Sequence, residues 1–419
     1  MKNIELKYGK NTININVPKK NLIGILKPKI SHQNICEKLE AKEVARALMN
    51  PIESPRISEI AKPGEKAAIM VSDITRPVPS RKLIPGILDE LNKAGIEDRD
   101  ITIIFGMGIH RSHTLDEQKK LVGEKVFNRI KCIDSNKDEY IFIGQSSKGT
   151  PLYLCKTIVE ADVRICTGNI EYHYFAGFSG GAKAIMPGAA NYESIKHNHK
   201  LQLQPGVATG KIIGNPVRED IDEIGEILGI SFILNVVLNE KKQILKAFAG
   251  DYIKAHREGC RYLDSIYGVE IEEKADIVIV SPGGYPKDVN LYQAQKSLDN
   301  AKYAIKENGT IILLAECIEG FGSKTFEEWI RAADSPKELV ERLKREFKLG
   351  GHKGAAIARI LLNNGVYIKT SMKKEDIEEI FFEIIDSVQE TLNGFIEKSD
   401  GNIKILIIPY GGSILPKAY

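Results

Sequence analysis

Short apolar segments rich in Val and Ile recur along the chain, and longer segments with helical periodicity separate them. Such an alternation is typical of βαβ units arranged around parallel sheets. Each apolar run is too short for a buried helix of ordinary length, so we predict a buried strand at each. In the first part of the chain the predicted strands are Ala67–Ser72, Ile101–Phe105, Tyr140–Gly144 and Ala161–Thr167. In the second part they are Ala275–Ser281, Thr310–Ala315, Val366–Thr370 and Ile403–Pro409.

The segments between these strands carry apolar residues at intervals of three and four, which predicts amphipathic helices that cross over the sheets. The clearest examples are Ser80–Ala94, Leu291–Glu307, Ser335–Phe347 and Lys374–Leu392. The predicted fold class is therefore α/β, with two α/β domains of mainly parallel sheets that flank an active-site cleft between them.

The chain has 419 residues, more than one hydrophobic core usually serves, so two domains are expected. Helical periodicity from Ala249 onward ends in a charged segment at Lys274, just before a new strand, and this places the boundary near residue 268. The last segment contains one more strand and a Gly-Gly turn; it can close the second sheet or return to the first domain. The predicted regions are an N-terminal domain of residues 1–268, a C-terminal domain of residues 269–400, and a C-terminal segment of residues 401–419.

The charge balance does not point to a polyanionic partner. Lys and Arg number 59 against 56 Asp and Glu, a formal charge of +3, so we expect no nucleic-acid partner. No apolar stretch approaches the roughly 20 residues needed to cross a bilayer, and the first residues lack the apolar region of a signal peptide. We therefore expect a cytoplasmic protein with no membrane partner.

The six cysteines are far apart and form no CxxC pair, which favours neither a zinc knuckle nor a disulfide framework. We expect buried, reduced thiols. The cysteines are Cys36, Cys132, Cys155, Cys166, Cys260 and Cys317.

Polar clusters follow three of the predicted strands. SDITRP (72–77), GMGIHR (106–111) and TGNIEYH (167–173) each begin where a strand ends. The carboxyl ends of parallel strands border the ligand crevice of an open α/β sheet, so side chains from these loops should share one site. The expected members are Asp73, Arg76, His110, Arg111 and His173.

Arg76 offers a planar guanidinium for a carboxylate or phosphate, and Pro77 restricts the backbone beside it. The functional interpretation is a site for a small anionic ligand. The alternative is a structural ion pair with Asp73.

Glycine is densest in AGFSGGAKAIMPGAA (176–190), where it surrounds Lys183. Such a loop can bring backbone N–H groups close to an anion, but it departs from the Walker pattern because Ala182 precedes the lysine and no Ser or Thr follows it. A lysine in a tight glycine turn can instead be a covalent anchor, as Schiff-base lysines are. The alternative is that the glycines serve only close packing.

Histidine is concentrated in the same segments. Of eight histidines, five lie in or near these loops: His110, His113, His173, His197 and His199. An isolated histidine is usually structural, but clustering after successive strands favours proton transfer by His110 and His173 and, less strongly, a role for His199. His113 and His197 lie outside the strand-end pattern. The other three are expected to be structural or supporting: His32, His256 and His352.

The combination of SDITRPVPS, GMGIHRSHT, GNIEYHYFAGFSGGAKAIMPGAA, KHNHK and LYQAQKSL resembles the nickel-pincer lactate racemase family. The resemblance extends over nearly the whole chain, and the long central motif is highly specific. It implies a two-domain α/β protein that carries a nickel-pincer nucleotide, the nickel complex of pyridinium-3,5-bisthiocarboxylic acid mononucleotide, joined covalently to a lysine. Two sulfurs, a ring carbon and one histidine would surround the nickel.

The resemblance also implies roles for individual residues. Lys183 matches the attachment lysine and His199 the nickel ligand, with His197 as the rival ligand in KHNHK. His110 and His173 match the paired catalytic histidines. The residues implied to hold the substrate are Arg76, Tyr292, Gln293 and Lys296. The residues implied to support or contact the cofactor are Asp73, Gly177, Gly180 and Gly181.

This chemistry suits a 2-hydroxy acid. Removing the C2 hydrogen as a proton would place a carbanion beside a carboxylate. Removing it as hydride leaves a neutral ketone instead. This second route needs an acceptor for two electrons and a base for the hydroxyl proton. The resemblance therefore implies reversible racemisation of D- and L-lactate through pyruvate. It also implies cofactor-synthesis proteins as partners, and another 2-hydroxy acid remains an alternative substrate.

Three other functions remain open. A zinc hydrolase could use Asp73 with His110, His173 and His199, although no HExxH segment supports it. A Schiff-base aldolase could use Lys183. The chain could also be a non-catalytic carrier of nickel or of a nucleotide.

Overall fold

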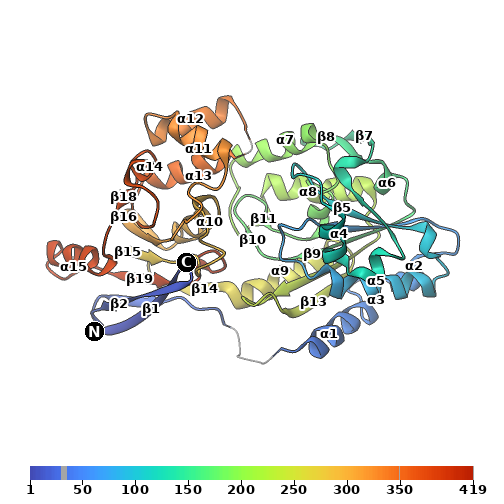
Figure 1. Ribbon diagram of the computed structural model, residues 1–419, viewed down its shortest axis with the longest axis horizontal. Coiled ribbons are helices and arrows are strands. Elements are labelled where there is room, and N and C mark those ends of the chain that lie inside the picture. Colours follow the sequence, from blue (N-terminus) through green and yellow to red (C-terminus); the bar gives the residue numbers. More distant parts are fainter. Residues whose placement is uncertain (30–34, 349, 419) are drawn as a thin grey trace. The chain divides into compact units, whose positions relative to one another are not determined.

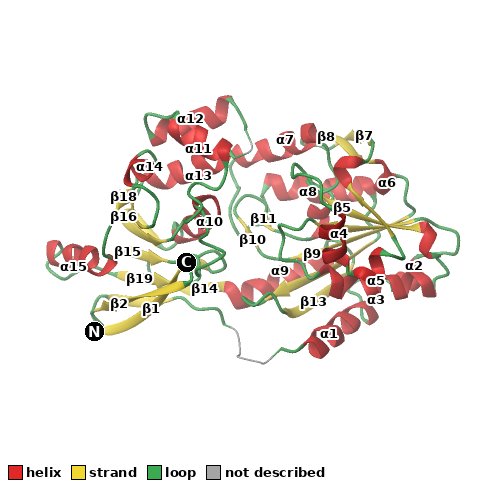
Figure 2. Cartoon of the chain, viewed as in Figure 1, coloured by secondary structure: helices red, strands yellow, loops and turns green. Residues whose placement is uncertain are grey.

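The computed structural model describes residues 1–29, 35–348 and 350–418. The chain divides into two units: unit 1 comprises Met1–Ile30 and Ser265–Tyr419, and unit 2 comprises Ser31–Asp264. Helices alternate with strands along much of both units, as Figure 2 shows. His32, expected to be structural, lies outside the described residues.

Unit 2 is built on a six-stranded sheet of order β13-β12-β9-β4-β5-β6, of which Figure 1 labels β13, β9 and β5. Its pairs are parallel except for the antiparallel pair at β12 and β13. The central strands are buried on both faces, which explains their continuous apolar sequences. The strands are β4 (Ala67–Ser72), β5 (Ile101–Gly106), β6 (Lys131–Asp134), β9 (Val163–Asn169), β12 (Phe232–Leu238) and β13 (Ile244–Gly250).

Two short antiparallel hairpins also lie in unit 2: β7 (Tyr140–Gln145) with β8 (Pro151–Cys155), and β10 (Tyr172–His173) with β11 (Gly177–Phe178). The helices are α1 (Glu37–Met49), α2 (Ile57–Ile60), α3 (Ser80–Lys93), α4 (Leu115–Val122), α5 (Glu124–Phe127), α6 (Lys156–Val159), α7 (Tyr192–Lys200), α8 (Pro216–Leu228) and α9 (Lys254–Tyr267). Short 3-10 turns are η1 (Asp98–Asp100), η2 (Ser135–Lys137), η3 (Gly181–Ala184) and η4 (Leu201–Leu203).

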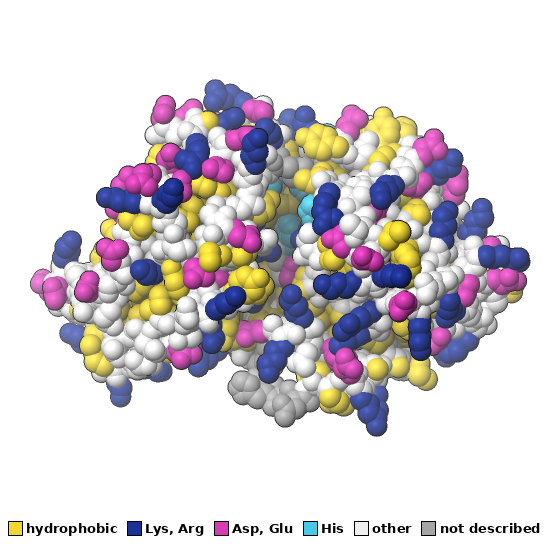
Figure 3. Space-filling model, viewed as in Figure 1, with side chains coloured by type: hydrophobic (Ala, Val, Ile, Leu, Met, Phe, Trp, Pro, Cys, Tyr) yellow, Lys and Arg dark blue, Asp and Glu magenta, His cyan; other side chains and the backbone are white. Residues whose placement is uncertain are grey.

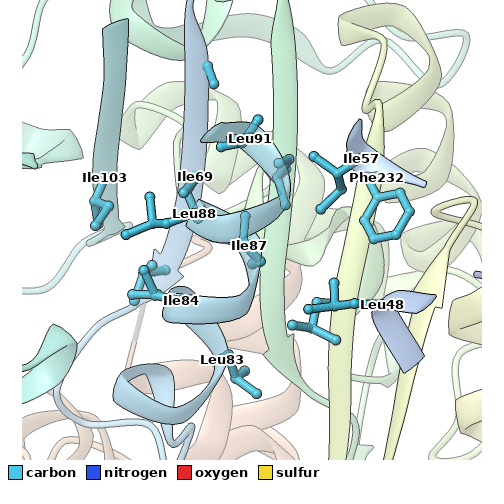
Figure 4. Close-up of a cluster of buried hydrophobic side chains, with 14 of the residues drawn as sticks. Leu48, Ile57, Ile69, Leu83, Ile84, Ile87, Leu88, Leu91, Ile103 and Phe232 are labelled. Atoms are coloured by element: carbon cyan, nitrogen blue, oxygen red, sulfur yellow. The ribbon is translucent and has the colours of Figure 1, made fainter. Parts of the chain in front are cut away.

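The core of unit 2 forms where α3 packs on the sheet. Leu83, Ile84, Ile87, Leu88 and Leu91 recur at helical spacing along α3, and all are buried. Figure 4 shows these side chains beside Ile69 and Ile103 of the sheet and Leu48 of α1. This packing anchors β4 and β5, the strands from which two of the polar loops depart.

Unit 1 is built on a second six-stranded sheet, of order β18-β17-β16-β15-β19-β3, in which every pair is parallel. Its strands are β3 (Leu22–Ile25), β15 (Ala275–Val280), β16 (Ile305–Leu314), β17 (Gly365–Lys369), β18 (Glu383–Ile384) and β19 (Ile405–Ile408). The hairpin of β1 (Lys2–Tyr8) and β2 (Asn11–Val17) and the parallel pair of β14 (Gly268–Ile271) and β20 (Leu415–Ala418) complete its strands. The helices are α10 (Leu291–Ala301), α11 (Lys324–Arg331), α12 (Pro336–Arg345), α13 (Gly351–Leu361), α14 (Lys374–Glu378) and α15 (Val388–Lys398).

The structure differs from the predicted domain limits at the N-terminal end of the chain and decides between the two alternatives at the C-terminal end. Residues 1–29 belong to unit 1 and not to the N-terminal domain, because β3 pairs with β19 and the β1–β2 hairpin shares an apolar core with the second sheet. Residues 401–419 belong to the same unit, since β19 pairs with β15 and β20 pairs with β14. The change of unit along the chain falls at Ser265, near the predicted 268.

Three predicted elements need correction. The predicted helix Lys374–Leu392 is interrupted: Phe381 adopts a left-handed φ of 62°, the short strand β18 follows, and Ser387 caps a separate α15. The predicted helix from Leu291 ends at Ala301, because the next apolar residues already form β16 beside β15. The predicted strand at Tyr140 exists, but it pairs antiparallel with β8 outside the main sheet.

On the face drawn in Figure 3, Lys and Arg side chains are interspersed with Asp and Glu side chains. Within the described ranges, no helix has both the length and the apolar character to span a membrane.

Candidate active site

The polar loops of unit 2 meet at the point where the strand order of its sheet reverses. From β4 the chain proceeds outward through β5 and β6, and then crosses to β9 and β12 on the other side of β4. The switch point therefore lies between β4 and β9, whose carboxyl ends carry the Asp73 loop and the His173 loop. Ligands of open α/β sheets bind at such points. The predicted adjacency of β9, β4 and β5 is confirmed.

Asp73 lies at the end of β4 and is nearly fully buried. Its Oδ1 accepts a hydrogen bond from the amide of Thr75 at 2.8 Å and lies 3.3 Å from Nδ1 of His110. Burial by itself raises the pKa of this carboxyl, but the adjacent imidazole of His110, the charge of Arg76 and the hydrogen bond from Thr75 outweigh it and lower the pKa of Asp73 to about 2. Asp73 is therefore ionised, and it orients the imidazole of His110.

The surroundings of Arg76 are compatible with both of its predicted roles, the ion pair with Asp73 and the binding of a small anion. Its Nε lies 3.7 Å from Oδ2 of Asp73, so the ion pair forms. At the same time, the side chain of Arg76 is 42% exposed, against 5% for Asp73. The guanidinium thus keeps open surface with which to bind an anion.

The loop after β5 is held by its own contacts. The carbonyl oxygen of Gly188 accepts from the amide of Gly108 and from Oγ of Ser135 at 2.9 Å, and Asn136 donates its side-chain amide to the carbonyl of His110 at 3.0 Å. The backbone that carries His110 is therefore fixed at several points. Arg111, in contrast, is exposed and forms a two-point pair with Glu117 at the start of α4, so the structure does not bring it to the predicted cluster.

His113 is a structural histidine beneath the Asp73 loop. It is buried, its Nδ1 lies 2.8 Å from Oδ1 of Asp134, and its Nε2 accepts from the amide of Ile74 at 3.1 Å. Because Nε2 accepts a hydrogen bond, the ring proton resides on Nδ1 and faces the carboxylate. His113 thus ties the segment next to Asp73 to the buried end of β6.

Phe175 is the side chain that connects three of the predicted site residues. Its ring centroid lies 4.4 Å from that of His173 and 4.9 Å from that of His199, and Nζ of Lys183 lies 6.0 Å from it. Phe175 is buried. Phe175 is not among the predicted site residues, because an aromatic residue next to a strand is most often ordinary core. Its place between His173 and the glycine-rich segment is the one signal in the sequence.

The glycines near Lys183 are required by the backbone itself. Gly177, Gly180 and Gly181 have φ values of 75°, 79° and 63°, in the left-handed region that side chains disfavour. A Cβ on Gly177 would overlap the carbonyl of Lys211. The amide of Gly181 donates to Oδ1 of Asn235 at 2.7 Å. These contacts support the packing role of the glycines and place η3, which carries Lys183, directly after them.

The two histidines of α7 occupy different environments. His199 is buried beside Phe175. Nδ1 of His197 lies 3.0 Å from Oγ1 of Thr150, which in turn donates to the buried carboxylate of Asp220 at 2.8 Å. Residues two apart on a helix do not share a face. His199 therefore joins the group around Phe175, and His197 joins the Thr150–Asp220 network.

The other expected substrate residues lie in unit 1, on α10. Asn290 caps this helix by accepting from the amide of Gln293 at 3.0 Å. Gln293 and Lys296 are both exposed and, three residues apart, share a face of the helix. The main-chain carbonyl of Tyr292 accepts from Nζ of Lys353 at 2.5 Å, and this ammonium lies 3.7 Å from the Tyr292 ring centroid.

The remaining titratable groups have structural environments. Burial raises the pKa of Cys132, Cys260 and Cys317 to about 12, in accord with inert thiols, whereas Cys36 is exposed, contrary to the expectation of burial. Burial lowers the pKa of His352 to about 3. Among the described residues, no group of three or more His, Cys, Asp or Glu side chains is placed to hold a metal ion, which is the arrangement that a zinc hydrolase would use.

The fold and the site define an α/β protein in which two histidines, a lysine and an ionised aspartate with its histidine partner gather near a sheet switch point in unit 2. The family model of the lactate racemase N-terminal domain matches residues 8–210, and that of the lactate racemase C-terminal domain matches residues 271–415. The chain belongs to the lactate racemase family.

Individual relatives agree with this assignment over their whole length. A lactate racemase of Thermoanaerobacterium thermosaccharolyticum is 35% identical over 425 residues, and one of Lactiplantibacillus plantarum is 32% identical over 426 residues; each comparison covers 99% of both chains. The structure of the lactate racemase apoprotein from T. thermosaccharolyticum superimposes with a TM-score of 0.90 at 34% identity, covering 99% of this chain and all of that one. A Thermotoga maritima protein with 18% identity and a TM-score of 0.62 shares the fold, over 92% of this chain and 99% of its own.

Proposed function

We propose that this racemase interconverts D- and L-lactate by reversible hydride transfer through pyruvate, with a nickel-pincer nucleotide joined to Lys183. The observation that carries the proposal is the group around Phe175, where His173, His199 and Lys183 approach one buried ring in a chain of the lactate racemase family. The neighbouring Asp73–His110 pair adds a second imidazole held by an ionised carboxylate.

The residues present fit the cofactor that the family implies. Lys183 and His199 approach the same phenyl ring, so a group tethered to the lysine has an imidazole nearby. Imidazole is a common ligand of nickel, and a lysine amine can form the covalent link. Gly177, Gly180 and Gly181 let the main chain pack closely before Lys183. When bound, the cofactor supplies an acceptor for the two electrons of the hydride.

The two histidines move the hydroxyl proton. Nδ1 of His110 faces ionised Asp73, which leaves Nε2 as the atom that takes the proton; the carboxylate then stabilises the imidazolium. Nδ1 of His173 accepts from the amide of Ala176 at 3.3 Å, so in this arrangement its ring proton resides on Nε2. One imidazole is thus poised to accept a hydrogen bond and the other to donate one, and the roles exchange with the direction of reaction.

The substrate carboxylate needs a cation that can orient it. The exposed guanidinium of Arg76, with its Nε oriented by Asp73, is suited to bind a carboxylate at two points. The resemblance adds Tyr292, Gln293 and Lys296 of α10 as further substrate-holding residues. Orientation matters here because pyruvate must present either face before hydride returns.

The direct test is an assay of the protein produced together with the cofactor-synthesis proteins that the family implies. Intact mass and nickel analysis should show one adduct on a peptide that contains Lys183, and the loaded protein should convert either lactate enantiomer to the racemate. A loaded protein that turns over a longer 2-hydroxy acid but not lactate would replace the substrate. A loaded protein that turns over neither would be a carrier.

A further inference from the structure

The main chain of residues 175–179, which leads into the Lys183 segment, is held by hydrogen-bond donors from other parts of unit 2. Five consecutive carbonyl oxygens, from Phe175 to Ser179, each accept a hydrogen bond from outside the segment. The donors are the side chains of Asn215, Arg218 and His256 and the amide of Gly210. Such complete use of successive carbonyls in an irregular segment indicates that its conformation is specified by the scaffold.

Arg218 contributes most to this arrangement. It lies in the first turn of α8 and is fully buried; its Nε donates to the carbonyl of Ala176 at 3.1 Å and a terminal nitrogen donates to the carbonyl of Phe178. A third contact joins it to Asp222 at 3.4 Å. One planar guanidinium therefore sets two carbonyls on either side of Gly177, a geometry that a point-charge ammonium cannot reproduce.

His256 continues the contact at the next carbonyl. Its Nε2 lies 2.8 Å from the carbonyl oxygen of Ser179, while a guanidinium nitrogen of Arg257 lies 2.6 Å from its Nδ1. Burial, with the charges of Arg218 and Arg257, lowers the pKa of His256 well below its usual value, so the ring is neutral and its proton is on Nε2. A Cβ at Gly181 would lie 3.0 Å from this ring, closer than side chains ordinarily pack, so the ring lies tightly against the main chain there.

Burying an arginine is costly, and an apolar side chain of similar volume would pack at lower cost. The free-energy cost of burying Arg218 is explained if the main chain of residues 175–179 must keep one conformation. That segment carries Phe175, which lies against His173 and His199, and leads into η3 with Lys183. The bonds of Arg218 to the carbonyls of Ala176 and Phe178 give it a route to this group through the main chain.

We propose that Arg218, supported by His256, is the positioning residue of the Lys183 loop, holding its main chain in the conformation in which the lysine can receive the covalent cofactor. The inference rests on the proposed function for the identity of that cofactor. The conformational part concerns the chain alone and is tested without any cofactor.

The first experiment is amide hydrogen exchange on the full-length apoprotein. Arg218→Lys retains the charge but not the two-point geometry, and peptides that cover residues 175–183 should exchange about tenfold faster than in the wild type. The matched control is Arg164→Lys. Arg164 also donates to main-chain carbonyls, those of Ile158 and Val159, but it lies away from the loop. The control should leave exchange in residues 175–183 unchanged.

The second experiment measures loading. Each variant is produced with the cofactor-synthesis proteins, and the fraction of Lys183-containing peptide that carries the adduct is followed by mass. Loss of a residue that supports a metal site typically lowers metal affinity or activity at least about tenfold. We therefore expect Arg218→Lys to load about tenfold more slowly, and Arg164→Lys to load as the wild type does. If Arg218→Lys does not fold, His256→Phe takes its place, because it keeps a ring but removes the donor to Ser179.

The outcomes separate the two claims. Equal exchange and equal loading in Arg218→Lys and Arg164→Lys, or in His256→Phe and wild type, would overturn the positioning role. Faster exchange in the loop without slower loading would also overturn it, since the conformation would then not matter for attachment. A wild-type protein that gains no adduct at Lys183 contradicts the proposed function instead, and in that case the exchange experiment still decides whether Arg218 holds the loop.

Discussion

Oδ1 of Asp73 lies 3.3 Å from Nδ1 of His110, and this carboxylate is buried while the imidazole is partly exposed. Because Nδ1 of His110 faces the ionised, buried carboxylate of Asp73, Nε2 is the ring nitrogen that points away from Asp73. Asp73→Asn keeps the shape but removes the charge. We expect it to reduce racemisation by the loaded protein about 100-fold while the adduct on Lys183 is retained.

A matched control for Asp73→Asn is Glu117→Gln. Glu117 also pairs with a basic residue of a strand-end loop, Arg111, but Arg111 is exposed and the pair lies outside the cluster. This variant should keep full activity in the same lactate assay. Equal losses in both variants would mean that charge in the neighbourhood, and not the orientation of His110, is what matters.

The pKa of Asp73 also predicts a pH dependence of stability. Its value is lowered to about 2 in the folded protein from 3.8, so the ionised form stabilises the fold above about pH 4, and this contribution is lost as the pH falls toward 2. The shift corresponds to about 2 kcal/mol. Urea unfolding of the wild type and of Asp73→Asn should differ by about that amount at pH 7 and converge at acidic pH. A difference independent of pH would contradict the assignment.

The environments of α7 predict which histidine binds nickel. His199 lies beside Phe175, and His197 is engaged by Thr150. Protein produced with the cofactor-synthesis proteins should lose its nickel on His199→Ala and retain it on His197→Ala, as measured by metal analysis of samples with equal adduct at Lys183. The reverse pattern would make His197 the ligand.

The buried contact of His113 with Asp134 predicts a structural effect. His113→Ala leaves a buried carboxylate without its imidazole and the amide of Ile74 without its acceptor, and the free energy of unfolding should fall by about 2 kcal/mol. Lys137→Ala removes a more distant, 58% exposed partner of the same carboxylate, and we expect a change below about 0.5 kcal/mol. Similar values for both variants would show that the imidazole contributes no more than a surface charge.

Local patterns in the sequence predict much of unit 2 around the site. The runs at β4, β5 and β9 are short, apolar and followed by polar loops, and the structure places them side by side with Asp73 next to His110. The same local patterns assign residues 1–29 to the wrong domain. The pairing of β3 with β19 joins segments from opposite ends of the chain, and no local pattern predicts it. β12 and β13 are absent from the predicted strands, although both are short apolar runs and pair with each other as neighbours along the chain.

The residues that support the site are the hardest to predict from the sequence. Arg218 reads in the sequence as a charged residue of an amphipathic helix, for which exposure is the usual state. Only its contacts with the carbonyls of Ala176 and Phe178, some forty positions earlier in the chain, show why it is buried. His256 was expected to be structural or supporting, and its bond to Ser179 is of that kind.

In the proposed reaction the hydrogen at C2 leaves as hydride and returns to the same substrate carbon. The measurement is conversion of L-lactate by the loaded protein in deuterium oxide, with the isotope at C2 of the D-lactate product read by NMR or mass spectrometry. We predict that the product keeps protium at C2, because the imidazoles exchange only the hydroxyl proton with solvent. Solvent deuterium at C2 of every product molecule would contradict the account and require proton abstraction from carbon instead.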